Sequence, residues 1–300
     1  MQRAHEIPED AGLAYWKSAT LARIGDDAAA RLTNDPRYDD VLRRIVSEVL
    51  AFYDAEPKLN AAFQEIGTIG LALFALYLDS KGGITHRRLT ELSNTSTVMS
   101  RGRASAILGL LRYKGLARPE KAAPNGVQFH YLPSPELVRF FTRRIGLEYE
   151  ALTLVEPAIR AFSDRWQSPG MLECFITNFG ADLVRAGQEP LSELESIAGI
   201  TRRRAGFQIL CHLLMLADRG HAFPSLAPFE INVSEIARRF FVARPQVRRI
   251  VSELEKENFL ARDGETFQFQ PLLQSKFRRF MATIHVALMA CAHDILKAQG

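Results

Sequence analysis

The stretch Leu89-Thr90-Glu91-Leu92 recurs 144 residues later as Val233-Ser234-Glu235-Ile236, and Leu116-Ala117-Arg118 recurs as Leu260-Ala261-Arg262. Between these anchors each copy carries an Arg-rich segment whose apolar residues also match. At a spacing of 143 residues they are Met99, Ala104, Ile107 and Leu111 in the first copy and Val242, Val247, Ile250 and Leu254 in the second. Self-similarity of this kind indicates an internal duplication.

Each copy carries the periodicity of helices followed by that of a β-hairpin. In the first copy we expect helices over 60–79, 86–94 and 98–114, and strands over 116–120 and 127–132. In the second copy we expect helices over 191–198, 201–218, 233–240 and 244–257, with a tight hairpin turn at Asp263-Gly264. Helix, turn, helix, strand, turn, strand is the order of a winged helix-turn-helix, in which the hairpin is the wing.

The duplicated unit is larger than this module, because amphipathic helices precede and follow it in both copies. Asp35-Pro36 has the pattern of a helix start, and Ser134-Pro135 opens the helix after the first hairpin. We predict a mainly α fold with two small β-hairpin wings: tandem winged helix-turn-helix domains related by an internal pseudo-twofold duplication, with flanking dimerisation-like helices. The predicted parts are an N-terminal arm over 1–36, a first unit over 37–167 with its winged module at about 60–133, and a second unit over 168–300 with its module at about 190–271.

The composition, with 47% hydrophobic and 24% charged residues, is ordinary for a soluble globular chain. The longest apolar run, over 69–78, is about half as long as a membrane-spanning helix, and the first residues lack the apolar core of a signal peptide. We therefore expect a cytoplasmic protein with no membrane association. The three cysteines and seven histidines have no metal-ligand spacing, and no phosphate loop or nucleophile elbow occurs. We expect no enzyme activity, no cofactor and no metal.

Basic residues are concentrated in the first module. The net charge is only +4, but residues 85–118 contain seven Lys or Arg and a single acid, Glu91. Residues 232–264 contain seven basic and five acidic residues, and three of these acids are Glu253, Glu255 and Glu257. A polyanion responds to the local field, so nucleic acid is a candidate partner, although a charge run can equally be a solvated helix face.

Candidate base contacts lie at the start of the Arg-rich helix, because the second helix of a helix-turn-helix enters the major groove with its first turns. Arginine can donate two hydrogen bonds to guanine, and glutamine can pair with adenine. The candidates are Ser100, Arg101, Arg103 and Ser105 in the first copy and Arg244, Gln246 and Arg248 in the second. These arginines could be exposed helix residues without a partner, but Arg101 and Arg244 occupy equivalent places, and this recurrence favours contact with DNA.

Phosphate contacts are expected from the starts of the preceding helices and from the wings. In the first copy the candidates are Thr85, Arg87, Arg88, Lys121 and Asn125, with His86 beside them. In the second copy they are Ser234, Arg238, Arg239, Arg249 and Arg262. Arg118 and Arg262 end equivalent strands, and the alternative for both is an ion pair with a local acid, Glu120 or Asp263.

Three residues in apolar helical stretches have competing interpretations. Cys174 and Cys211 could sense oxidants if they were exposed and activated, but their apolar neighbours favour inert packing. His212 is interpreted as a satisfied core residue rather than a ligand.

The start of the first Arg-rich helix and its exit toward the wing carry a family resemblance. The residues concerned are Ser100-Arg101, Ile107, Leu111 and Lys114-Gly115-Leu116. They resemble the MarR-type winged-helix transcription regulators, in which a Ser-Arg start precedes a Leu-rich helix and a Lys-Gly-Leu entry to the wing. The second copy keeps this pattern loosely, as Ala243-Arg244 and Asn258-Phe259-Leu260. The resemblance implies flanking helices that build a homodimer, and a cleft for a small-molecule effector. A subunit of that family has one module, whereas this chain has two.

We therefore expect a sequence-specific, double-stranded DNA-binding transcription regulator, a single-chain pseudo-dimer that places two recognition helices in successive major grooves. Its site should be an imperfect palindrome, because the two Arg-rich helices differ. The partners are double-stranded DNA and an unidentified small-molecule effector, and the chain acts as a monomeric pseudo-dimer or a homodimer. One alternative is a tandem winged-helix scaffold that binds proteins, of the condensin-associated type, which the acids at 253–257 favour. The other is a plasmid-type replication initiator, which also binds DNA.

Overall fold

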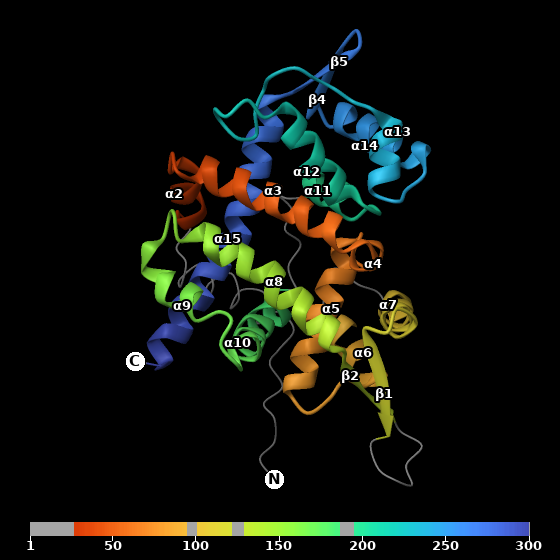
Figure 1. Cartoon of the computed structure of the whole chain (residues 1–300), viewed down its shortest axis with the longest axis vertical. Helices are drawn as coiled ribbons and strands as arrows, with labels where there is room; N and C mark the ends of the chain where they lie inside the picture. Colours follow the sequence, from red (N-terminus) through yellow and green to blue (C-terminus); the bar gives the residue numbers. More distant parts are fainter. Residues whose placement is uncertain (1–26, 95–100, 122–128, 187–194, 300) are drawn as a thin grey trace.

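The computed structural model describes residues 27–94, 101–121, 129–186 and 195–299, and these residues are mainly helical (Figure 1). The first half opens with α2 (Ala28–Asn34), α3 (Tyr38–Ala55) and the short α4 (Pro57–Ala62). Then follow α5 (Ile66–Ser80), α6 (His86–Asn94), α7 (Arg101–Tyr113), the hairpin β1 (Ala117–Lys121) and β2 (Phe129–Pro133), and the long helix α8 (Pro135–Leu152).

The second half follows a similar order after two short helical turns, η1 (Pro157–Ile159) and α9 (Arg160–Asp164). It begins with α10 (Met171–Ala186) and α11 (Glu195–Thr201). Then follow α12 (Gly206–Ala217), β3 (Phe229–Glu230), α13 (Val233–Arg239), α14 (Arg244–Lys256), the hairpin β4 (Leu260–Asp263) and β5 (Thr266–Phe269), and α15 (Pro271–Gln299). Three helices, a hairpin and a long helix therefore follow one another in both halves.

The described residues contain two small antiparallel sheets, which confirms the prediction of a mainly α fold with two hairpins. β1 pairs with β2, and Ile84 adds to β2 through a single bridge to Tyr131. β4 pairs with β5, and β3 adds to β5 through Phe229 and Phe267, so the strand order is β3-β5-β4. In both halves, residues before the second helix of the group, α6 or α13, therefore pair with the second strand of the hairpin, β2 or β5.

The third helix of each half ends in the same backbone motif. Gly115 and Asn258, which are 143 residues apart, have left-handed φ angles of 71° and 56°. The amide that follows each of them donates to a carbonyl in the last turn of the helix, Leu116 to Leu111 at 2.7 Å and Phe259 to Leu254 at 2.8 Å. This helix cap turns the chain into the hairpin, and glycine and asparagine are the residues that best tolerate it.

The long helices α8 and α15 bury equivalent positions at a spacing of 136 residues. The buried pairs are Leu137 and Leu273, Phe141 and Phe277, Ile145 and Met281, Tyr149 and His285, and Leu152 and Leu288. Each helix has a proline in its first turn, where the missing amide costs nothing. Ser134 caps α8 by accepting the Leu137 amide at 3.2 Å, as the Ser-Pro pattern predicts.

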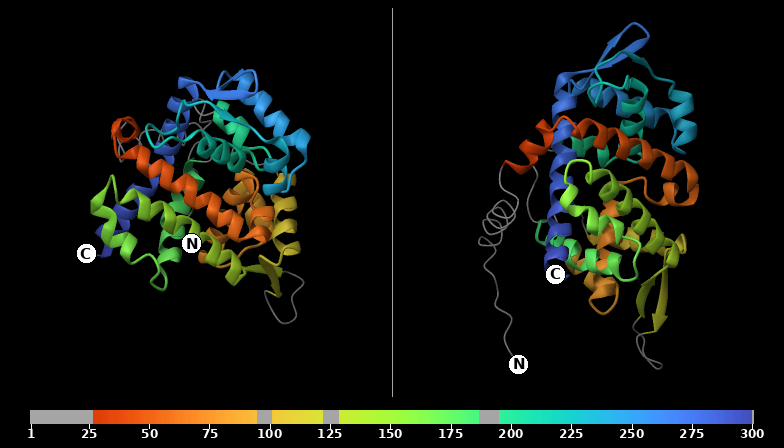
Figure 2. Two further views of the ribbon diagram at one scale, coloured as in Figure 1. Left: turned by 45° about the horizontal axis from the view of Figure 1, so that its top comes forward. Right: turned by 60° about the vertical axis from the view of Figure 1, so that its left-hand side comes forward.

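The three-helix groups are α5–α7 in the first half and α12–α14 in the second. A longer helix that lies before each group in the chain, α3 or α10, packs against the group of the other half. α3 lies against α12 of the second half as well as α8 of its own half. In the same way, α10 lies against α5 of the first half as well as α15 of its own, and α8 and α15 contact each other. The apolar side chains of both halves consequently form one connected core. Helix α15 runs from the second hairpin past α3 and α8 to the region of α9 (Figures 1 and 2).

The predicted helix over 60–79 is wrong in its continuity, because the structure divides it into α4 and α5. The carbonyl of Phe63 accepts a hydrogen bond from the Gln208 side chain at 3.0 Å, and the carbonyl of Gln64 accepts the Ala205 amide at 2.8 Å. These carbonyls bond to the second half instead of continuing the helix. Apolar periodicity cannot reveal such a break, because the partners lie about 140 residues away in the chain.

The predicted helix over 201–218 is wrong at its start, because α12 begins only at Gly206. Ala205 has a left-handed φ of 57°, which a continuous helix does not permit. A Cβ atom added at Gly206 would lie 1.9 Å from the carbonyl oxygen of Ile200. The residues between Thr201 and Gly206 therefore form a tight turn that requires glycine.

The N-terminal arm is partly helical, since its residues 28–34 form α2, which packs on α15. The predicted helix start at Asp35-Pro36 is wrong, because α3 begins at Tyr38. Asp35 instead accepts the Arg37 amide at 2.9 Å and pairs with its guanidinium. The rest of the arm, up to residue 26, lies outside the described residues.

Within the described residues, α15 is the one helix long and apolar enough to cross a membrane by length and composition. Half of its most apolar window is buried inside the fold. A buried helix of this kind is typical of a protein core.

A network of buried polar side chains joins α3, α8 and α15. The two ring nitrogens of His285 lie 2.8 Å from the Tyr38 hydroxyl and 2.9 Å from the Glu148 carboxylate. Arg144 pairs with the same carboxylate at 2.6 Å. Burial by itself would raise the pKa of Glu148, but the charge of Arg144 and the contact with His285 outweigh it and lower the pKa to about 2. The carboxylate is therefore ionised and ties the three helices together.

Candidate nucleic-acid-binding surface

Helix α14, the predicted recognition helix of the second half, is strongly amphipathic. Val247, Ile250, Val251 and Leu254 form its buried face, and Pro245 suits its first turn. Its exposed face carries Arg244, Arg248 and Arg249. None of these three guanidinium groups forms a hydrogen bond or ion pair with another described residue. The helix therefore presents three unpaired cations at the surface. The predicted base contact Gln246 is instead held against the chain before α12, because its side-chain amide donates to the Arg204 carbonyl at 3.3 Å.

Helix α7, the predicted recognition helix of the first half, begins at Arg101 and buries Leu108 and Leu111. Ser100 lies outside the described residues, as do the side chains of Arg101 and Arg103. The Ser105 hydroxyl lies 2.7 Å from the ring nitrogen of His86, which links α7 to the start of α6. The base contacts predicted for this half stay predictions.

At the start of α6, two residues predicted to contact phosphate, Thr85 and Arg88, form hydrogen bonds within the protein instead. The Thr85 hydroxyl accepts the Arg88 amide at 3.1 Å and so caps the helix. The Arg88 guanidinium donates to the carbonyls of Gly83 and Lys81 at 2.9 and 3.2 Å, which fixes the preceding turn. Arg87 points outward, with 87% of its side chain exposed, and pairs with Glu91 one turn later. Of the two arginines, Arg87 is the one at the surface, where it shares its charge with Glu91.

The start of α13 is capped by Asn232, which accepts the amides of Ser234 and Glu235 at 3.1 Å. Arg238 is exposed and has no partner among the described residues. Arg239 pairs with Asp54 of α3 at 2.7 Å and donates to the His212 ring at 2.8 Å. Arg239 therefore joins the two halves, and we do not retain it as a phosphate contact.

The hairpins present one described cation each at equivalent strand positions. Arg262 donates to the Gly264 carbonyl at 3.0 Å and stacks over the Phe267 ring, so it does not pair with Asp263. Arg118 is exposed, and Glu120, its predicted alternative partner, lies 2.9 Å from His130 instead. Asn125 and the side chain of Lys121 lie outside the described residues.

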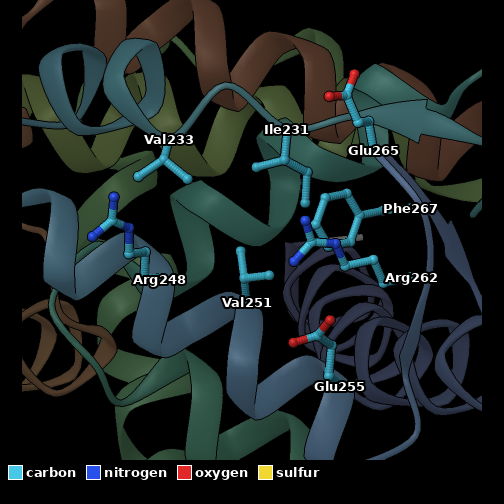
Figure 3. Close-up of a pocket in the computed structure, with 8 residues that line it drawn as sticks. All are labelled: Ile231, Val233, Arg248, Val251, Glu255, Arg262, Glu265 and Phe267. Atoms are coloured by element: carbon cyan, nitrogen blue, oxygen red, sulfur yellow. The ribbon is translucent and has the colours of Figure 1, made fainter.

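A hollow of about 370 Å³ separates α14 from the second hairpin (Figure 3). Its apolar lining is Ile231, Val233, Val251 and Phe267, and its charged lining is Arg248, Glu255, Arg262 and Glu265. Two arginines and two glutamates give the hollow no dominant charge. The hollow lies between Arg248 of α14 and Arg262 of the hairpin, and its mixed charge does not favour an anion.

A second hollow, of about 590 Å³, lies between the two halves. It is lined by Tyr53, Asp54, Pro57 and Asn60 from α3 and α4, and by Glu235, Arg238, Arg239 and Phe241 from α13 and the turn after it. Within the described ranges, no group of three or more His, Cys, Asp or Glu side chains could hold a metal ion. Cys211 is buried, as its apolar neighbours predict, and burial raises the pKa of its thiol to about 12, which disfavours the reactive thiolate.

Sequence reasoning missed a group of arginines beside α14. Arg202, Arg203 and Arg204 form the turn before α12, which periodicity assigns to a helix. Arg202 and Arg204 are exposed, while Arg203 forms a bidentate ion pair with Glu253 of α14. Three consecutive arginines followed by Ala-Gly were the available signal, because glycine often ends or interrupts a helix.

The two predicted recognition helices lie on the same side of the molecule. In Figure 1, α14 and α7 are both on the right, with α4 between them, and the hairpins are at opposite ends of the long axis. The views of Figure 2 agree that the hairpins lie far apart. Helix α14, which carries three exposed arginines, therefore shares a side of the molecule with α7.

Comparison with protein-family models, with curated proteins and with solved structures found no match to this chain.

The contact between Arg239 and His212 predicts a pH dependence of stability. His212 is buried and satisfied, as expected of a core histidine, and burial together with the positive charge of Arg239 lowers its pKa to about 4. An unfolded chain binds a proton at His212 near pH 6.5, whereas the folded protein does so only near pH 4, so stability should fall as the pH falls between these values.

Urea unfolding at pH 6.5 and pH 5.0 measures this dependence. We expect the wild-type protein to lose more stability between the two pH values than His212→Asn, which keeps a side-chain acceptor near Arg239 but does not titrate. Equal losses in the two proteins would contradict the assignment.

Proposed function

We propose that this chain is a sequence-specific, double-stranded DNA-binding transcription regulator, built as a single-chain pseudo-dimer of two winged helix-turn-helix units. The observation that carries the proposal is the reciprocal packing of α3 on α12 and of α10 on α5. The matching caps at Gly115 and Asn258 and the matching faces of α8 and α15 support the same duplication. Two such modules related by a twofold axis read two half-sites in successive major grooves.

In the second half, the proposed contacts are the cations that the fold leaves available, and in the first half they are mainly residues predicted from the sequence. Arg244 and Arg248 read bases in one half-site, and Arg249, Arg238 and Arg262 contact its phosphates. In the other half-site, bases are read by Ser100, Arg101, Arg103 and Ser105, and phosphates are contacted by Arg87, Lys121 and Asn125. Because the two sets differ, the site is an imperfect palindrome.

The alternative function, a protein-binding scaffold, is supported by the acids near the end of α14, and one of these acids is already neutralised. Glu253 pairs with Arg203 of the same half, so it does not offer its charge to a partner. A replication initiator would share the DNA binding, and no described feature favours it.

The proposal includes a cytoplasmic location and an effector of unknown identity. The hollow between α3–α4 and α13 has room for a small molecule, and a molecule bound there would contact both halves. Its occupancy would be coupled to the position of α13, and through it to α14.

Fluorescence anisotropy with genomic DNA fragments at 50 and 200 mM salt tests the proposal. Each neutralised phosphate releases counterions, so the five proposed cationic contacts should weaken binding by about 500-fold between these concentrations. Light scattering of the complex should give one chain per pseudo-palindromic site, or two if the chains also dimerise. Absent binding, or binding that salt does not weaken, would contradict DNA recognition and favour the scaffold.

A further inference from the structure

The turn formed by Arg202, Arg203 and Arg204 is built by contacts with both halves of the molecule. On one side, the Arg204 carbonyl accepts the Gln246 side chain from the start of α14 at 3.3 Å. On the other side, the Ala205 amide donates to the Gln64 carbonyl, just before α5, at 2.8 Å. The turn therefore lies at the junction of the halves and next to the start of a predicted recognition helix.

Several contacts hold this turn in place. Gln64 also donates from its side chain to the Phe240 carbonyl at 2.6 Å, in the loop that leads to α14. Arg203 anchors the turn to α14 through Glu253. At Gly206, a Cβ atom would lie 1.9 Å from the Ile200 carbonyl oxygen, so the backbone closes tightly behind the arginines. The cations at 202 and 204 are consequently presented from a rigid base.

The charges of Arg202 and Arg204 are available at this position. Arg202 is exposed and has no bonding partner in the part of the chain that the structure describes. Arg204 donates from its Nε to the Gln64 side chain at 2.6 Å, and its terminal nitrogens have no described partner. The residues directly before α5, 62–65, include no cation. The first half therefore has no equivalent of this feature.

We propose that Arg202 and Arg204 contact the minor groove at the centre of the DNA site and make the protein prefer A·T-rich DNA there. This inference rests on the proposed function. Two recognition helices in successive major grooves leave a minor groove between them that faces the protein. The turn lies beside α14, at the junction with the first half, which is where that groove would pass. Arginine is attracted to the narrow, strongly negative minor groove of A·T-rich sequences.

Selection from a randomised duplex library first yields the site of the wild-type protein. Affinities are then measured on duplexes that keep both half-sites but carry A·T, G·C or inosine·C pairs at the centre. We expect the wild-type protein to bind the A·T centre about tenfold more tightly than the G·C centre. Inosine lacks the amino group that guanine places in the minor groove, so the inosine·C centre should resemble the A·T centre.

Arg202→Ala and the double variant Arg202→Ala/Arg204→Ala should reduce this preference stepwise to about twofold or less, with the half-site preferences unchanged. The single variant keeps the test informative if loss of the Arg204–Gln64 contact disturbs folding, which thermal unfolding would detect. The matched control is Arg165→Ala, an exposed arginine at the end of α9, on the opposite side of Figure 1 from α7 and α14.

Two results would overturn the inference and leave the proposed function intact. They are wild-type binding without a central preference, and a central preference that persists in the double variant. If the wild-type protein binds no DNA, the proposed function and this inference fail together.

Discussion

Replacing Glu148 with glutamine should lower the free energy of unfolding by about 3–5 kcal/mol, the usual effect of removing one partner from a buried ion pair. The substitution leaves the buried Arg144 without its counter-charge and weakens the contact with His285. Urea unfolding monitored by circular dichroism at pH 7 measures the change. Because the pKa of Glu148 is lowered to about 2, its contribution in the wild-type protein should be lost as the pH falls from about 4.5 toward 2.

Glu150→Gln is the matched control, two residues along the same helix. Glu150 pairs with Arg44, but 60% of its side chain is exposed, so its loss should cost about 0–1 kcal/mol. The double variant Arg144→Met/Glu148→Leu removes both buried charges and should recover most of the stability lost in Glu148→Gln. A loss below about 1 kcal/mol in Glu148→Gln would show that the network does not hold α3, α8 and α15 together.

Replacing Arg244 and Arg248 together with alanine should weaken specific DNA binding by about a hundredfold or more, since each bidentate contact with a base contributes about 1–3 kcal/mol of discrimination. Both guanidinium groups are exposed and unpaired among the described residues, so the fold should be unaffected. Missing-contact footprinting should show the loss in one half-site, with the contacts of the other half-site retained.

Lys256→Ala provides the control for this variant, because Lys256 is an exposed cation at the far end of α14. It should change affinity by less than about threefold, as expected for a cation away from the groove. Equal weakening of both half-sites by the Arg244 and Arg248 substitutions would contradict separate reading by the two halves. An unchanged affinity would remove α14 from the proposed interface.

Local patterns predicted the elements whose determinants lie close together in the chain. The cap at Ser134, the hairpin turn at Gly264 and the apolar stripe of α14 each depend on neighbouring residues. The errors arose where distant contacts decide the backbone. The break between α4 and α5 exists because Phe63 and Gln64 bond to the second half, and no periodicity over 60–79 contains that information.

In the candidate site, too, features set by neighbouring residues were predicted and features set by distant contacts were not. That α14 carries exposed arginines opposite an apolar face can be read from its sequence, and the structure has them there. That Arg239 pairs with Asp54 and His212, or that Arg88 fixes the turn before α6, depends on groups brought near by folding. The arginines of the turn at 202–204 were missed because their position beside α14 arises from a contact between residues distant in the sequence, Arg204 and Gln246.

The reciprocal packing of α3 and α10 has a consequence for stoichiometry. Two separate subunits must meet before they can act, and their pairing weakens on dilution, whereas the halves of this chain are paired at any concentration. Two unlike subunits would also form like-with-like pairs in a mixture. Because α3 and α10 each pack on the other half within one chain, every molecule has one half of each kind in a fixed orientation. If the proposed function holds, an asymmetric DNA site is bound without sorting of subunits, even when only a few molecules are present in a cell.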